Sequence, residues 1–246
     1  MRIEIDPDLD FASYYDGGGD PDQTCERLYQ WHQALCLRPV ESVGPFEIDI
    51  TYDYAYGLRL RTPDGTTFRL GSDGIIPTWS TPGYLSRFPP ELAAEVALDA
   101  DDFFRLASTI GGYVLFPRNS AGQTGQTINQ ARGVNRQIAD RFDLTLECIR
   151  RHYQNPELDS PLAGRLNYYR DFFALFRDFD TYVRFFLLDD LVTSDRKGVW
   201  SLLTASVLND FPAAGFATSP MEYAAFRRNS IQFVRARNRR IQRLEL

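Results

Sequence analysis

The residues best suited to bind a ligand lie between positions 117 and 152, in the sequence PRNSAGQTGQTINQARGVNRQIADRFDLTLECIRRH. A short apolar run precedes a loop with two glycines, and helices follow, so backbone N–H groups and helix N-termini gather at one end of a sheet. This order favours a polar or phosphate-bearing ligand. The loop GQTGQT is not a Walker loop, because it contains no lysine, and it is not a dinucleotide fingerprint. The expected contacts are Arg118, Asn119, Thr127, Asn129, Arg132 and Arg136.

The helix expected after this loop carries acidic side chains that could transfer protons. Asp143 and Glu147 are four residues apart and therefore share one helix face, with Asp140 nearby. Glu147 and His152 are the candidate general acid and base of the cluster. The alternative is a solvated face with ion pairs such as Glu147 with Arg151, and a His152 that caps the helix carbonyls.

A different chemistry is suggested by Arg27 and His32, which enclose four residues in RLYQWHQ. An Arg, four to six residues and then a His is the pattern of the HEPN ribonuclease superfamily, which this stretch resembles. The resemblance implies a ribonuclease of the toxin or phage-defence type, in which Arg27 holds phosphate and His32 moves protons. The alternative is a histidine beside Trp31 whose ring is satisfied at the edge of the core.

The last predicted helix is basic and suggests a third class, a non-catalytic interaction protein. Basic helices attract phosphate backbones, so nucleic acid must be considered. The whole chain is acidic, however, and the helix has an apolar side, which favours packing on the body with ion pairs to LLDDLV. Nucleic acid is therefore the less favoured partner, and no protein partner is identified. The basic residues are Arg227, Arg228, Arg235, Arg237, Arg239, Arg240 and Arg243.

The composition is that of a folded protein without a membrane span. The chain has 246 residues, of which 43% are hydrophobic and 14% aromatic, and its net charge is −6. No run approaches the roughly 18 apolar residues of a transmembrane helix, and the N-terminus lacks an export signal, so a cytosolic location is expected. Three cysteines and two histidines match no zinc spacing, so we expect no metal and no cofactor. The chain has 26 arginines and one lysine, so we expect any anion to be recognised by arginine side chains.

The elements that must position these residues indicate one α+β domain over 1–246. Alternating residues and the turn Pro63-Asp64-Gly65 predict a hairpin near 46–70, and YVLFP predicts a strand near 113–117. Residues 71–83 are expected to form a loop. This strand-rich first half should pack on a helical second half. Helices are expected over 21–36, 90–96, 99–110, 134–153, from 160 onward, 178–192 and 220–246.

Several long blocks resemble a family of bacterial proteins known only as a domain of unknown function. The blocks are STIGGYVLFPRN, TINQARG, IADRFDLTLECIRRHYQ and FFLLDDLV. The likeness extends from about residue 28 to about residue 241, which implies a single domain. It brings no known activity, substrate or catalytic residues.

Overall fold

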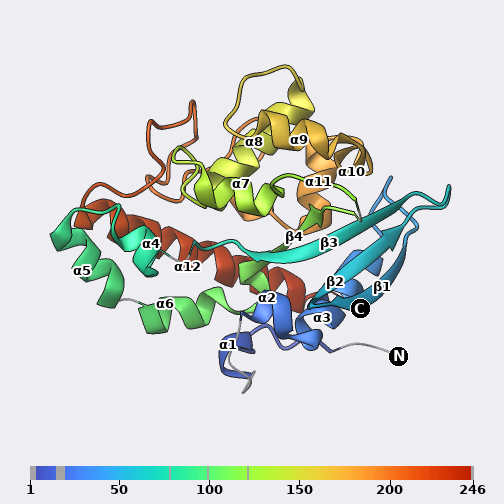
Figure 1. The fold of residues 1–246 in the computed structure, drawn as a ribbon, viewed down its shortest axis with the longest axis horizontal. Helices are drawn as coiled ribbons and strands as arrows, with labels where there is room; N and C mark the ends of the chain where they lie inside the picture. Colours follow the sequence, from blue (N-terminus) through green and yellow to red (C-terminus); the bar gives the residue numbers. More distant parts are fainter. Residues whose placement is uncertain (1–3, 15–19, 78, 99, 121, 245–246) are drawn as a thin grey trace.

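The computed structural model describes residues 4–14, 20–77, 79–98, 100–120 and 122–244. At its centre is an antiparallel sheet in the order β1-β2-β3-β4, with α3 and α7 on either side of it (Figure 1). The α+β class, the hairpin and the strand near 113–117 are confirmed. The strands are β1 (Glu47–Asp53), β2 (Ala55–Arg61), β3 (Thr67–Gly74) and β4 (Tyr113–Arg118).

The helices follow the predicted order but are more divided. One hydrophobic core draws on both halves of the chain, and the long helix α12 runs through the middle of the molecule (Figure 1). The helices are α1 (Phe11–Tyr14), α2 (Pro21–Thr24), α3 (Glu26–Leu37), α4 (Pro82–Leu85), α5 (Pro90–Leu98), α6 (Ala100–Ala107), η1 (Ile110–Gly112), α7 (Ile128–Val134), α8 (Phe142–Gln154), α9 (Ala163–Tyr168), α10 (Arg170–Ala174), α11 (Phe179–Phe186), η2 (Asp189–Leu191) and α12 (Pro220–Gln242).

Two of the predicted boundaries that are wrong lie near the candidate residues. The helix expected over 134–153 begins only at Phe142, because residues 135–141 form a turn. Ile138 is fully buried in that turn, so it continued the apolar period without being helical. The expected loop at 71–83 also begins late, because β3 extends to Gly74 by pairing with β4.

The two faces of β3 meet different helices. The side chains of Ser72 and Asp73 point to opposite faces because residues alternate along a strand. Ser72 Oγ lies 3.0 Å from His32 Nε2 of α3, whereas Asp73 pairs with Arg132 of α7. The sheet is thus enclosed between α3 and α7 at this end of β3.

Strands β2 and β3 separate near the same place. Their pairing runs from Arg61–Thr67 to Leu58–Leu70 and stops there. Helix α2 contacts both strands. The end of the sheet therefore presents backbone groups that the ladder does not satisfy.

Two side chains take over these backbone groups. The Tyr29 hydroxyl accepts from the Ser72 N–H at 3.0 Å, and Arg118 donates to the Tyr56 carbonyl at 3.1 Å. Arg118 reaches Tyr56 by crossing Gly71, where a Cβ atom would lie 1.8 Å from Arg118 Nε. Glycine at position 71 is needed for this close approach.

A buried arginine, Arg237 of α12, connects several elements in the interior by hydrogen bonds. Its guanidinium donates to the carbonyls of Phe186 at 3.1 Å, Gly111 at 3.0 Å and Tyr113 at 2.6 Å. Burial, with the nearby charge of Arg38, lowers its pKa to about 9. This one side chain joins α12 to α11, η1 and β4.

Replacing Arg237 by lysine should destabilise the fold by about 3 kcal/mol, because an ammonium cannot reach three separate carbonyls and leaves buried acceptors unsatisfied. Urea unfolding followed by circular dichroism measures the change. Arg235→Lys, at an exposed position of the same helix, is the control and should change stability by less than about 0.5 kcal/mol. Equal effects of the two substitutions would contradict the role assigned to Arg237.

Candidate functional site

Arg132 is the centre of a polar cluster at the separated end of the sheet. Its side chain is fully buried and pairs with Asp73 of β3 and, at 3.5 Å, with Asp140. Nε donates to Thr145 Oγ1 at 3.0 Å, and Nη2 donates to the carbonyls of Asp140 at 2.8 Å and Gly74 at 3.3 Å. Most of the five guanidinium donors are therefore used within the protein.

The two carboxylates remain accessible although their arginine is not. The side chain of Asp73 is 14% exposed and that of Asp140 is 19% exposed. Asn129 is partly buried and hydrogen-bonds the Asp73 side chain. Tyr84 is also partly buried, and its hydroxyl donates to the Gly133 carbonyl at 3.1 Å. We call Asp73, Asp140, Arg132, Asn129 and Tyr84 the carboxylate cluster.

The backbone beneath Asp140 is strained. Ala139 and Asp140 have φ values of 48° and 62°, a left-handed conformation that non-glycine residues seldom adopt. Trp79 holds the turn by donating from Nε1 to the Ala139 carbonyl at 2.9 Å, and Arg132 holds the Asp140 carbonyl. Strain of this kind persists only where surrounding contacts impose it, and it is common at ligand sites.

The buried environment of the cluster favours the protonated forms of its two carboxyl groups. Burial, opposed by Arg132 and reinforced by the charge of Asp140, raises the pKa of Asp73 to about 7. Burial also raises the pKa of Asp140, against the attraction of Arg132. The pKa values of the two carboxyl groups beside one guanidinium are therefore both raised, and the groups titrate as a pair.

A third carboxyl group, that of Asp22 in α2, interacts electrostatically with Asp73. Burial raises its pKa to about 8, and the charges of Asp20 and Asp73 add to the shift. Its side chain is 7% exposed, and its Oδ1 atom has no hydrogen-bond partner among the described residues. The Tyr29 hydroxyl donates to its backbone carbonyl at 2.6 Å, which fixes α2 against the sheet.

Two of the six expected ligand contacts belong to the cluster, namely Asn129 and Arg132. Arg118 lies nearby, but its guanidinium crosses Gly71 to the backbone. Asn119 and Thr127 have structural partners: Asn119 binds the Gly125 carbonyl at 2.8 Å, and Thr127 forms a capping box with Gln130 at the start of α7.

Arg136, the sixth expected contact, lies elsewhere. It is exposed and lines a separate pocket of about 580 Å³ with Arg87, Phe216 and Thr218. The side chain of Arg87 lies over the rings of Tyr84, at 5.1 Å, and Phe216, at 5.6 Å. Through Arg87, this pocket adjoins Tyr84 at the edge of the carboxylate cluster.

The expected acid–base pair on α8 is not formed. Glu147 is fully buried and accepts from Arg150 at 2.8 Å and from Arg151 at 2.9 Å. Its carboxylate is therefore engaged in ion pairs within α8. His152 packs its ring 5.4 Å from that of Phe173, and burial lowers its pKa. Asp143 is likewise buried and pairs with Arg141. The geometry does not support proton transfer by Glu147 and His152.

The ribonuclease interpretation fails on the placement of His32. That ring is 3% exposed and bonds Ser72, and burial lowers its pKa to about 3, so it stays neutral. Arg27 lies over Trp31 at 6.0 Å and lines a surface pocket. A buried neutral His32 cannot exchange protons with an RNA substrate bound at the surface.

Asp73, Asp22 and Tyr84 were not predicted from the sequence. Asp73 stands in GSDG, which has the composition of a loop, and nothing local shows that the strand continues through it. Its pairing with Arg132 joins residues 59 positions apart. The cysteines Cys25, Cys36 and Cys148 are free and buried, and no group of His, Cys, Asp and Glu in the described part of the chain could hold a metal ion.

A family model described as a family of unknown function (DUF6994) matches residues 5–241. The chain belongs to the DUF6994 family. This confirms the expected membership of an uncharacterised family, while the bacterial source stays a prediction. No curated protein and no solved structure matches the DUF6994 chain. None of its described helices is both long and apolar enough to cross a bilayer.

The raised pKa of Asp22 predicts a pH-dependent stability. Between about pH 4 and pH 8 the folded protein holds the Asp22 proton while the unfolded chain releases it, so stability falls as the pH rises through this window. Asp22→Asn removes the ionisation, so its stability relative to wild type should increase by roughly 1.4 kcal/mol for each pH unit between pH 5 and pH 8. Urea unfolding at several pH values measures this.

Asp49→Asn is the matched control, because Asp49 is exposed and pairs with Arg59 at 2.9 Å on the sheet surface. It should leave the pH profile unchanged. The same slope in wild type and Asp22→Asn would show that Asp22 ionises normally.

Proposed function

We propose that this protein, expected in the bacterial cytosol, binds a small polar molecule bearing hydroxyl or ammonium groups at the carboxylate cluster. In this proposal Asp73 and Asp140 receive the ligand's hydrogen bonds and exchange a proton with it. The observation that carries the proposal is the arrangement of two partly exposed carboxylates on one fully buried arginine.

The charge of the cluster supports a neutral or cationic ligand over a phosphate. Two carboxylates and one guanidinium sum to −1 when ionised, and a shared proton brings the sum to zero. Arg132 has given most of its donors to Thr145, Asp73 and backbone carbonyls, so little is left for a phosphate. Carboxylate oxygens are strong acceptors for ligand O–H and N–H groups.

The shared proton also suits the pair to acid–base chemistry. A carboxyl group with a pKa near the operating pH can both accept and return a proton. The strained turn at Ala139 and Asp140 fixes one of the two carboxylates by backbone contacts, so its position is preorganised. Asn129 adds an amide that holds Asp73 in place.

A second candidate, binding of a phosphate-bearing ligand, is favoured by the pocket beside Tyr84. This pocket of about 580 Å³ is lined by two arginines, Arg87 and Arg136. Both are exposed, and neither has an ion-pair partner within the described chain. Their guanidinium groups present the planar donors that recognise phosphate oxygens.

The test is a thermal-shift panel with polyols and sugars, amino alcohols and diamines, and nucleotides and sugar phosphates. A ligand at a hundred times its dissociation constant should stabilise the protein by about 2.7 kcal/mol. We expect a hit among the hydroxyl or amine compounds. Asp140→Asn should weaken binding at least tenfold, because it removes an anionic acceptor and the shared proton.

Two control variants separate the candidates. Asp49→Asn, on the exposed face of the sheet, should bind as wild type does. Arg136→Ala should leave a hydroxyl or amine ligand unaffected but abolish binding of a phosphate compound. A panel in which only phosphates stabilise the protein, with loss in Arg136→Ala and none in Asp140→Asn, would replace the first proposal by the second.

A further inference from the structure

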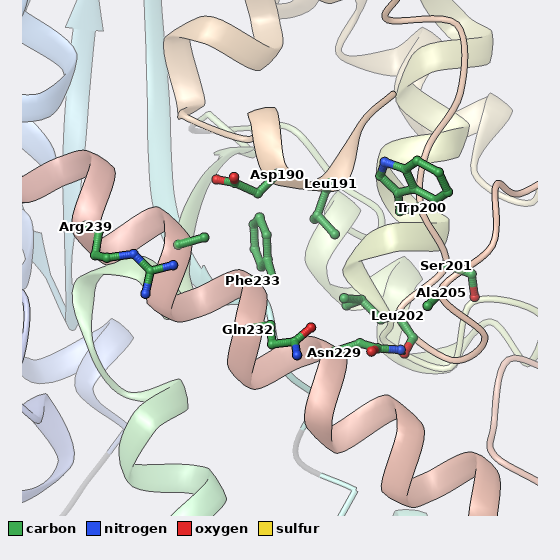
Figure 2. A pocket seen from close by; sticks show the side chains of 11 residues that line it. Asp190, Leu191, Trp200, Ser201, Leu202, Ala205, Asn229, Gln232, Phe233 and Arg239 are labelled. Atoms are coloured by element: carbon green, nitrogen blue, oxygen red, sulfur yellow. The ribbon is translucent and has the colours of Figure 1, made fainter. Parts of the chain in front are cut away.

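A groove separate from the carboxylate cluster runs along helix α12. It has a volume of about 430 Å³ and lies between α12 and residues 190–205 (Figure 2). Leu191, Leu202 and Phe233 form its apolar part, and each is at most 4% exposed. Figure 2 shows Trp200 and Arg239 toward opposite ends of the groove. We call this feature the α12 groove.

Trp200 is unusual for a tryptophan of this chain. Its side chain is 39% exposed, whereas Trp31 and Trp79 are 3% and 2% exposed. Its backbone N–H donates to the Leu191 carbonyl at 2.8 Å, so the indole is held at the edge of the groove by its main chain. Exposed tryptophans beside an apolar floor are typical anchoring sites for a partner's side chain.

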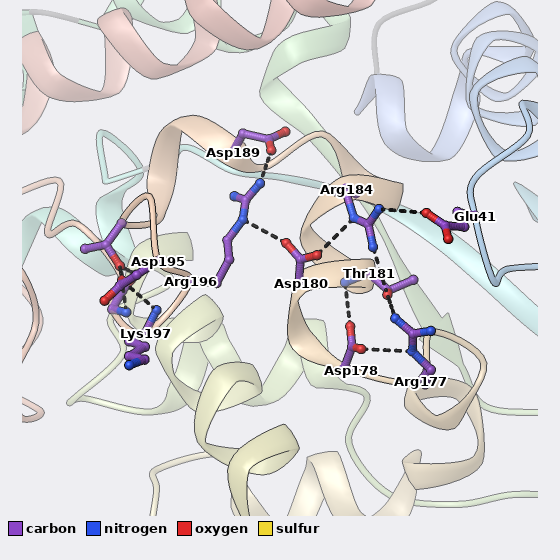
Figure 3. A network of polar contacts seen from close by, with 12 residues as sticks. Glu41, Arg177, Asp178, Asp180, Thr181, Arg184, Asp189, Asp195, Arg196 and Lys197 are labelled. Carbon is purple, nitrogen blue, oxygen red and sulfur yellow. Dashed lines mark hydrogen bonds and ion pairs between the residues drawn. The ribbon is translucent and has the colours of Figure 1, made fainter.

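The wall that carries Trp200 is fixed by two sets of charges. The buried pair Arg141–Asp143 binds it, since Asp143 accepts from the Leu202 N–H at 2.7 Å and Arg141 donates to Ser201 Oγ at 3.2 Å. Behind it, Arg196 links Asp189 of η2 to Asp180 of α11 (Figure 3). The groove is therefore preformed, which lowers the entropic cost of binding.

The opposite wall of the groove is polar and ends in a positive charge. Asn229 fastens α12 to the loop by donating to the Leu202 carbonyl at 2.9 Å. Gln232 is exposed, and its amide can donate and accept, as a peptide backbone requires. Arg239 is exposed and has no ion-pair partner within the described residues. The neighbouring Arg240, by contrast, is paired with Asp190 at 3.1 Å.

The length of the groove suits an extended segment of chain. Asn229 and Arg239 both line it and are ten residues apart, which corresponds to about 15 Å along the helix. An extended peptide rises about 3.3 Å per residue, so four or five residues span this length. A single ring or a small sugar would leave much of the groove empty.

We propose that the α12 groove docks a short extended peptide that places an apolar side chain against Trp200 and an acidic side chain against Arg239. The amide of Gln232 then bonds the peptide backbone between the two anchors. A single-stranded nucleic acid fits the groove less well, because it carries a phosphate at every nucleotide, whereas Arg239 is the one cationic side chain among the described residues that line the groove.

The experiment uses the full chain and end-capped five-residue peptides that alternate Leu or Phe with Glu, together with the same peptides carrying Lys in place of Glu. Trp200 reports binding directly, since it is the exposed tryptophan and acrylamide quenches its fluorescence. We expect the acidic peptides to protect it from quenching and the basic peptides to leave it accessible. Trp200→Phe confirms the origin of the signal.

The variants test the charge at the end of the groove. Arg239→Ala should raise the dissociation constant of the acidic peptides at least tenfold, and Arg239→Glu should transfer binding to the basic set. Arg228→Ala, at an exposed position of α12 outside the groove, should leave affinity unchanged. Arg239 and Arg228 are both exposed, so the unfolding curves of these variants should match that of wild type.

Three results would overturn the proposal. Acrylamide quenching unchanged by every peptide would show that the groove takes no extended segment. Equal affinity in wild type and Arg239→Ala would remove the acidic anchor. Protection of Trp200 by oligouridylate instead of the peptides would assign the groove to single-stranded nucleic acid.

Discussion

The contact between Arg132 and Asp73 is the interaction on which the candidate ligand site depends. It joins α7 to β3, and the same guanidinium reaches α8 through Thr145 and the 139–140 turn through a carbonyl. A buried arginine is costly unless its donors are satisfied, so these segments must come together before the charge can be enclosed. The position of Asp140 follows from this requirement, because its turn is shaped by the bonds that Arg132 makes.

Buried guanidinium groups explain much of the unusual arginine content. Arg132, Arg141 and Arg237 are at most 2% exposed, and each bonds carbonyl oxygens of segments distant in sequence. A guanidinium offers five donors in a plane and can bridge several irregular segments, which an ammonium cannot do. The excess of arginine over lysine therefore has a structural use in this fold.

The helices and strands could be predicted from the sequence where a local sequence pattern alone determines the structure. Alternation and the turn Pro63-Asp64-Gly65 identified the hairpin, and the capped, basic helix near the C-terminus is α12. Errors arose where tertiary contacts decide the backbone: Ile138 keeps the helical period but lies in a turn that Asn135 and Arg132 hold.

The candidate site was predictable only in part, for the same reason. Asn129 and Arg132 were recognised by residue type, yet their partner Asp73 is separated from them by more than fifty residues and stands in a segment with loop composition. Glu147 and His32 showed the reverse error. Each has a chemically capable side chain, but burial removes it from any ligand. Residue type indicates what a group can do, whereas exposure decides whether it does so.

The carboxylate cluster and the α12 groove are built in the same way. In each, a buried arginine helps to fix an irregular segment that faces solvent: Arg132 donates to the Asp140 carbonyl, whereas Arg141 donates to Ser201 Oγ and its partner Asp143 accepts from the Leu202 N–H. Arg132 fixes the turn that presents Asp140, and Arg141 with Asp143 fixes the loop that presents Trp200. Loops usually lose precision to motion. Here internal charges hold them in place, so a conservative change of either arginine to lysine would loosen the segment that presents Asp140 or Trp200.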